Sequence, residues 1–189
     1  MNTKSILTTL LILSGSLAHA DKDTPVPPEV QKLAENLVAA LKSADDAALL
    51  ACWHTPEALA KVKQAEEAAE AAAAGKTLSP EDLAEEGEDE IKDRTKENKD
   101  TTERAARLRA FLNKHFGELS ALTLQSVDLD VDNDAPAEQS AYDDIDLLLR
   151  TADGTMLTID VDDLIKIEGV WKFTGRLDDD INIELPEKN

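Results

Sequence analysis

Residues 142–173 read YDDIDLLLRTADGTMLTIDVDDLIKIEGVWKF, and this stretch decides the fold. Its apolar residues recur at every second position in short runs, which is the spacing of strands that bury one face. Turn residues separate the runs, first at Asp153-Gly154 and again at Glu168-Gly169. The pattern predicts four strands joined by tight turns, over 142–150, 155–161, 164–167 and 170–173.

The same period of two extends upstream over residues 122–131. The alternation slips by one position near Gln125 and Ser126, which predicts a β-bulge. Residues 132–138 are polar, and we predict that they form a loop between this strand and the next.

Two apolar stripes at helical spacing precede the strands. One consists of Val30, Leu33, Leu37, Val38 and Leu41, and the other of Leu108, Phe111, Leu112, His115 and Phe116. Between them Asp45 or Asp46 is predicted to cap a short helix that reaches Trp53. Helices followed by antiparallel strands indicate an α+β fold, with N-terminal helices packed on a curved antiparallel sheet of four to five strands.

The stretch over residues 55–105 differs in composition from its surroundings. Thr55 and Ser79 are each followed by proline, which is the pattern of a helix start. Over residues 85–104, Ile91 is the only large apolar residue. Such helices cannot build a core, so we predict an inserted, charged helical hairpin that projects into solvent, with partial disorder as the alternative.

The first 20 residues have the three parts of a cleavable secretory signal peptide. Lys4 supplies the positive charge, residues 6–13 form a short apolar run, and Ala18 and Ala20 are the small residues that a signal peptidase reads. An uncleaved N-terminal membrane anchor is the alternative. The predicted organisation is a signal peptide over 1–20 and a single domain over 21–189, interrupted by the insertion of 55–105. The protein would then be periplasmic or secreted.

The chain contains 40 Asp and Glu against 20 Lys and Arg, which gives a net charge of −20. This charge repels phosphate backbones and anionic lipid head groups, so we expect neither nucleic acid nor a membrane surface as a partner after signal cleavage. A small apolar ligand or a protein of the cell envelope is the expected partner. The sequence does not define the ligand or the oligomeric state.

Two stretches of the sequence resemble a known superfamily. One is the helical opening LKSADDAAL at 41–49, and the other is the ending DLIKIEGVWKF at 163–173. Together they resemble the nuclear-transport-factor-two-like superfamily, which includes polyketide cyclases and ketosteroid isomerase, and in particular its small exported members of unassigned function. The resemblance covers residues 28–54 and 106–186. It implies a cone-shaped sheet wrapped around a helix, with a pocket at the open end.

The candidates for lining such a pocket are Trp53, His54, Phe111, His115, Tyr142 and Trp171. His115 is a candidate general acid or base, because the ordinary pKa of histidine suits proton transfer near neutral pH. Tyr142 is a second catalytic candidate, because aspartates follow it closely in the strand. The alternative for each residue is plain packing, either at the boundary of the core or within it.

Metal and cofactor sites have no supporting motif. The alternating aspartates of 128–134 begin like a calcium loop, but Asn133 stands where Gly is needed and Gln139 where Glu is needed. Loose calcium binding by clustered carboxylates and a solvated acidic face are the alternatives that stay open. Cys52 is the only cysteine and has apolar neighbours, which favours a small buried hydrophobe. We therefore predict no metal and no cofactor.

These observations favour an exported soluble binding or interaction module without catalytic activity. The alternative is a pocket enzyme of the isomerase or cyclase type, in which His115 or a strand carboxylate transfers a proton. A third reading is an acidic surface protein that buffers cations. The state of the pocket, open or filled by aromatic side chains, separates the first two.

Overall fold

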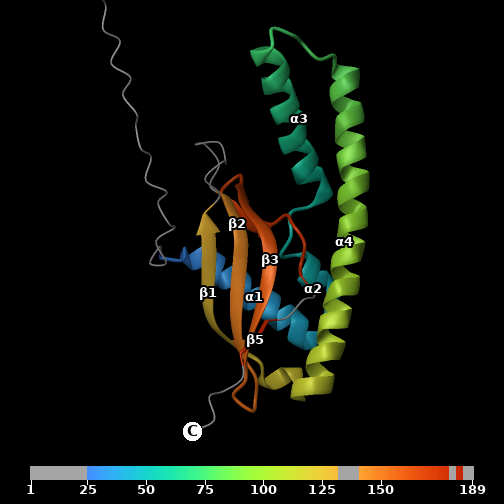
Figure 1. Cartoon of the computed structure of the whole chain (residues 1–189). Coiled ribbons are helices and arrows are strands. Elements are labelled where there is room, and N and C mark those ends of the chain that lie inside the picture. Colours follow the sequence, from blue (N-terminus) through green and yellow to red (C-terminus); the bar gives the residue numbers. More distant parts are fainter. Residues whose placement is uncertain (1–24, 132–140, 179–181, 185–189) are drawn as a thin grey trace, which may run out of the picture.

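In the described part of the chain, four helices come first and a curled antiparallel sheet follows, so the predicted α+β fold is confirmed (Figure 1). The computed structural model describes residues 25–131, 141–178 and 182–184. The helices are α1 (Pro28–Ser43), α2 (Asp46–Leu50), α3 (Pro56–Ala73) and α4 (Pro80–Phe116), followed by the 3-10 turn η1 (Leu119–Ala121). The strands are β1 (Thr123–Val131), β2 (Ala141–Arg150), β3 (Met156–Ile167), β4 (Val170–Phe173) and β5 (Asn182–Glu184). The predicted signal peptide and the loop over 132–138 lie outside the described residues.

The strands lie in the sheet in chain order, β1-β2-β3-β4, and each is antiparallel to its neighbour. The short strand β5 pairs with the first residues of β3. The register between β1 and β2 shifts between Leu124 and Ser126, which confirms the predicted bulge. The bulge lets both halves of β1 direct apolar side chains to the same face, because Leu124, before it, packs against the core and Val127, after it, is buried.

Strand β3 is longer than the sequence indicated. We predicted separate strands over 155–161 and 164–167, but the structure has one strand through both. Asp163 adopts a left-handed φ of 49°, and the pairing with β2 continues past it without a shift. The unusual backbone conformation of Asp163 affects the opposite edge of β3, which faces the end of β4. There the amide of Thr174 donates to the carbonyl of Asp163 at 2.9 Å.

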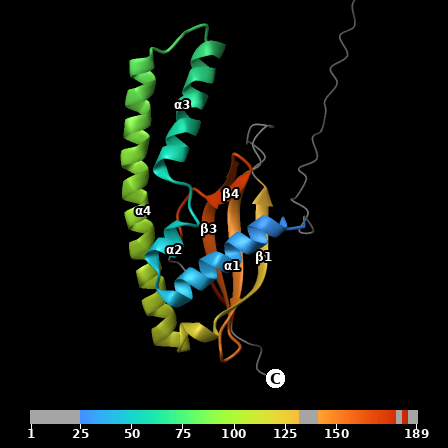
Figure 2. The same ribbon diagram turned by 180° about the vertical axis from the view of Figure 1, so that it is seen from behind.

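Helix α1 lies across one face of the sheet and supplies the centre of the core (Figure 2). Its predicted apolar stripe is buried, and Leu37 and Leu41 are completely so. On β2 and β3 the residues that face α1 alternate with polar ones, and those fully buried are Ile145, Leu147, Leu149, Leu157, Ile159 and Val161. Each such side chain contributes about 1.5–3 kcal/mol when removed from water, so this contact is the main source of stability.

The helix ends follow local sequence chemistry. Asp45 caps α2 by accepting from the amide of Ala48 at 2.9 Å, although α2 ends at Leu50, before the predicted Trp53. Thr55 caps α3, and Ser79 forms a capping box with Asp82 at the start of α4, so both predicted starts are confirmed. Caps of this kind stabilise a helix by about 1 kcal/mol each.

Helices α3 and α4 form the predicted hairpin, whose distal part projects beyond the sheet (Figures 1 and 2). The boundary predicted at residue 105 falls inside α4, which is a single helix of 37 residues. Arg94 joins α4 to the main body: its guanidinium donates to Glu90 and Glu97, both at 2.7 Å, and to the carbonyl of Thr174 at 3.1 Å. We call residues 56–93, which lie beyond this junction, the arm. None of the described helices is both long enough and apolar enough to cross a bilayer.

Candidate functional site

Trp53 and His54 attach the end of α2 to β4, and their polar atoms are used in this attachment. The indole Nε1 of Trp53 donates to the carbonyl of Gly175 at 2.8 Å, and its ring lies 5.1 Å from that of Phe173. The Nε2 of His54 lies 3.2 Å from the carbonyl oxygen of Ile165, so Nε2 carries the proton. Burial lowers the pKa of His54 and keeps its ring neutral. These two residues pack in the core.

Tyr142 and Trp171 contact each other on the sheet. Their ring centroids are 5.3 Å apart, Trp171 is buried, and the ammonium of Lys166 lies 5.5 Å from the Trp171 ring. Burial raises the pKa of Tyr142, so its hydroxyl stays protonated at neutral pH. Tyr142 therefore packs on a buried ring of the sheet.

Phe111 and His115 lie near the end of α4. The ring of His115 is exposed and stacks on that of Phe111 at 4.5 Å. The sequence places His115 on the same helical face as Leu108, and in the structure Leu108 is buried while the ring of His115 is exposed. His115 lies on the side of α4 that carries the buried residues. The last turn of α4 lies at the margin of the core, however, so position 115 is exposed to solvent. The six candidates therefore form three separate contacts, and their role as a site stays a prediction.

Cys52 is buried and free, as expected for a small hydrophobe. Its thiol lies 3.6 Å from the carbonyl oxygen of Ala48. Desolvation raises the pKa of this thiol to about 11, with a smaller opposing effect from Lys172. The thiolate needed for nucleophilic chemistry is therefore scarce at neutral pH.

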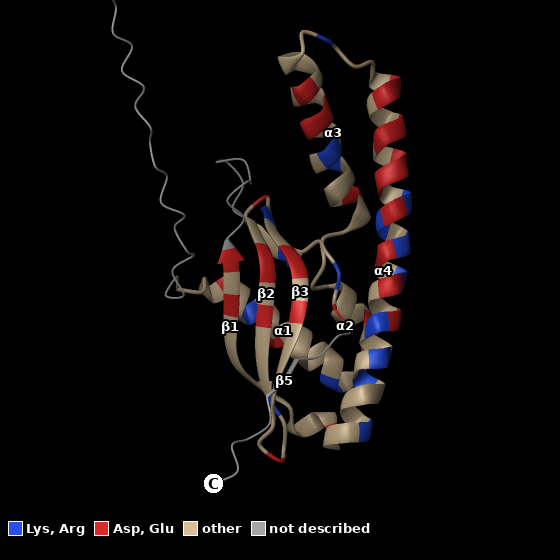
Figure 3. Ribbon diagram, in the orientation of Figure 1, with Lys and Arg blue, Asp and Glu red and all other residues tan. Residues whose placement is uncertain are grey.

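The face of the sheet turned away from α1 carries a set of aspartates, which we call the acidic face (Figure 3): Asp128, Asp144, Asp146, Asp160 and Asp162. Asp128 lies directly across from Asp146 on the next strand, and Asp146 directly across from Asp160 on the third. Like charges in directly opposite positions destabilise a sheet. Repulsion within the acidic face therefore lowers the free energy of unfolding of the protein.

Asp160 lies at the centre of the acidic face. Its pKa is raised from 3.8 to about 6, first by burial and then by the charges of Asp144, Asp146, Asp162 and Asp178. The pKa of Asp146 is also raised, by burial and then by its aspartate neighbours. The Oδ1 atom of Asp160 is buried and has no hydrogen-bond partner among the described residues.

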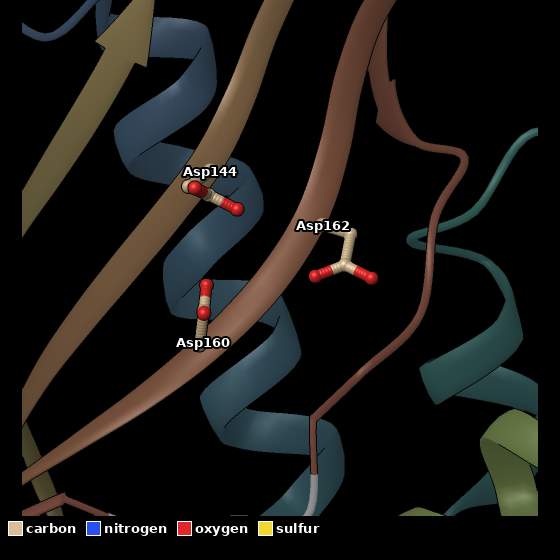
Figure 4. Close-up of side chains that lie close together, drawn as sticks. All are labelled: Asp144, Asp160 and Asp162. Atoms are coloured by element: carbon tan, nitrogen blue, oxygen red, sulfur yellow. The ribbon is translucent and has the colours of Figure 1, made fainter.

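Figure 4 shows Asp144, Asp160 and Asp162 close together, one from β2 and two from β3. One carboxylate oxygen from each lies within 4.8 Å of the others, so the group can attract a hard cation. Calcium takes about 6–8 oxygen ligands, and three carboxylates supply only part of that shell. Sequence reasoning considered instead the alternating aspartates of 128–134, of which residues 132–134 lie outside the described residues. The signal it missed was the strand register, which brings Asp144 opposite Asp162.

A groove of about 450 Å³ lies between α1 and the start of β1. Its walls are formed by Glu35, Val38, Ala39, Lys42, Ser43, Ser120, Leu122 and Leu124. Lys42 crosses it to donate to the carbonyl of Leu122 at 2.9 Å. None of the six side chains predicted to line a pocket contributes to this groove.

No known protein family, curated protein or solved structure matches the chain. What the structure does share with the resemblance noted in the sequence is coarse, namely helices followed by a curled antiparallel sheet that contacts α1.

Proposed function

We propose that the protein is an exported binding module without catalytic activity, and that its arm contacts a protein with a basic surface. The observation that carries this proposal is the composition and exposure of the arm. Residues 56–93 hold twelve Asp and Glu against four Lys. Most of these carboxylates are exposed, including those of Glu85, Glu86, Glu88 and Asp89.

The arm contributes little to the core, which favours a role outside it. Only Leu59, Ala60 and Gly87 are buried between residues 56 and 93. Ordering each residue costs roughly 1–2 kcal/mol of backbone entropy, and three small burials do not offset that for so long a segment. Helix hydrogen bonds and ion pairs can hold the arm, but neither explains why the chain extends it into solvent. A partner surface supplies the missing reason.

The finer resemblance to the nuclear-transport-factor-two-like superfamily is part of the same proposal, and α1 lying across the curled sheet supports it. The alternative, a pocket enzyme of the isomerase or cyclase type, needs His115 or Tyr142 inside a cavity beside a carboxylate. His115 is exposed, and Tyr142 packs on Trp171. These contacts favour the binding module over the enzyme.

Site-specific photo-crosslinking in the native cells tests the role of the arm. A crosslinking amino acid replaces Ala68 or Glu85 in the arm, with the exposed Val170 of the main body as the matched control position. We expect one discrete adduct from the arm positions and none from the control. The adduct should weaken several-fold when Glu85, Glu86 and Glu88 are changed to Gln, because Gln keeps helix propensity and removes charge. Equal adducts from Val170, or a yield unaffected by the Gln changes, would contradict the proposal.

Export has its own test, since the signal peptide is proposed from residues 1–20 alone. We expect the mature protein outside the cytoplasm to begin at or near Asp21, as read by N-terminal sequencing. Replacing Ala18 and Ala20 by bulky residues should block cleavage and leave the longer form. A protein recovered from the cytoplasm with Met1 intact would refute export and leave the proposal for the arm standing.

A further inference from the structure

In the part of the chain that the structure describes, strand β1 leaves one side of the sheet without a partner. Within the described residues it is hydrogen-bonded to β2 alone, and Figure 1 shows it at the edge of the sheet. Alternate residues of an edge strand direct their main-chain N–H and C=O groups outward, where another extended chain can pair with them. This edge is nine residues long, which is enough for a stable ladder.

The two faces beside this edge differ in chemistry. On the face turned away from α1, Asp128 and Asp130 are exposed, and Asp128 continues into the acidic face through Asp146. On the face toward α1, Leu124 opens onto the groove, whose apolar wall is completed by Val38. A strand added to β1 alternates its side chains between these faces. One set would meet carboxylates and the other an apolar groove.

We propose that β1 binds an extended peptide segment in which Lys or Arg alternates with apolar residues. Its basic side chains pair with Asp128 and Asp130, and an apolar side chain about three residues away, on the opposite face, enters the groove beside Leu124. The charge of the edge argues for this occupant and against a second copy. If two β1 edges paired, each would place its own aspartates beside those of the other.

This inference concerns a surface separate from the arm, so either proposal can fail alone. The probe is an acetylated, amidated peptide of four Lys-Val repeats, titrated into the purified protein and followed by backbone amide NMR. We expect saturable shifts on β1 and binding at least about tenfold tighter than that of a peptide with four Lys followed by four Val. A Lys-Val peptide N-methylated at every valine tests the main-chain pairing, because it keeps charge and side chains but loses donors along one edge.

Matched protein variants locate the site. Changing Asp128 and Asp130 to Asn should weaken Lys-Val binding about tenfold, while changing Glu85 and Glu86 of the arm to Gln, which removes the same charge, should leave it within about twofold. The proposal would be overturned if the peptide with four Lys followed by four Val bound equally well, or if the chemical shift changes fell on the arm. Either result would show that binding is non-specific charge attraction. Protection of the outward-facing amides of β1, those that do not pair with β2, in the free protein would also overturn it, since the edge would then be covered by a second copy or by the chain itself.

Discussion

Gly175→Ala should destabilise the protein by about 3 kcal/mol, which lowers Tm by roughly 6–12 °C. A Cβ at this position would lie 2.6 Å from both the Cβ and the carbonyl oxygen of Asp162. It would also lie 2.7 Å from the carbonyl carbon, so the obstacle is main chain that cannot rotate aside. The carbonyl of Gly175 also accepts the indole hydrogen bond of Trp53, and a shift of the loop would break that bond.

Gly87→Ala is the matched control, because it also adds one methyl group at a crowded glycine. The new Cβ would collide with the side-chain amide of Gln64, which is the movable end of a flexible side chain. Gln64 would give up its 2.6 Å hydrogen bond to the carbonyl of Leu83, a loss of about 1 kcal/mol. Alanine regains about 1 kcal/mol in helix propensity, so the net change should lie within about 1 kcal/mol.

Thermal and urea unfolding of the two variants measure the contrast. Gly175→Ala should unfold well below the wild type, with Gly87→Ala close to it. If the two variants proved equally stable, the loop over 174–178 would not be held rigidly against β3, and the attachment of α2 through Trp53 would have to be loose as well.

Much of this fold could be predicted because its signals are local. The helix starts at Thr55 and Ser79 depend on a capping hydroxyl and a proline directly after it, and both were predicted correctly. The turn at Glu168 and Gly169 was also predicted correctly, and both residues adopt positive φ there. Alternation fixed which face of β2 is buried, since Ile145, Leu147 and Leu149 all point to α1.

The prediction went wrong where a single residue departs from the local pattern. The alternation predicts one strand over 155–161 and another over 164–167, which leaves the adjacent aspartates Asp162 and Asp163 between them. Asp163 instead adopts a left-handed conformation, and hydrogen bonds with the loop after β4 keep β3 continuous. Those bonds come from residues about ten positions further on, and no local pattern in the sequence reports them.

The candidate site was harder to predict, because it depends on register and on helix length. The spacing of His115 places it on the buried side of α4, but the sheet determines where along α4 the core ends. His115 lies past that end and is exposed. The acidic face depends on pairing: Asp144 and Asp162 are eighteen positions apart in sequence and lie directly opposite each other in the sheet. Spacing along one strand identifies the face on which an aspartate lies but does not identify its neighbours on other strands.

Asp160→Asn should stabilise the protein at pH 8 by about 1 kcal/mol, because it removes a partly buried charge from the centre of the acidic face. Asp160 faces Asp146 directly and lies close to Asp144 and Asp162. Asparagine has nearly the same shape, and its amide can donate to a neighbouring carboxylate. We expect Tm to rise by a few degrees, measured by circular dichroism at low salt and again in 0.5 M NaCl, where screening should reduce the gain.

The stabilisation should depend on pH in a direction set by the pKa of Asp160. This pKa is about 6 in the folded protein and near 3.8 in the unfolded chain, so at pH 8 Asp160 is charged in both states, and burial of its charge and repulsion by its neighbours act fully on the folded state. As the pH falls through 6, the folded protein takes up a proton that the unfolded chain does not. The wild type therefore gains stability relative to Asp160→Asn, and the gap in Tm should close as the pH approaches 4.

Two other groups separate this effect from general acid sensitivity. The pKa of His54 is lowered by burial, so acidification below 6.5 weakens the folded state, but this happens equally in both proteins and cancels in the difference. Asp153→Asn is the control of opposite sign, because hydrogen bonds from Thr151 and Thr155 lower the pKa of Asp153, and removing its charge should destabilise the protein at neutral pH. A gap between Asp160→Asn and wild type that stays constant from pH 8 to pH 4 would show that neither burial nor the neighbouring aspartates raise the pKa of Asp160. The acidic face would then be an ordinary solvated surface.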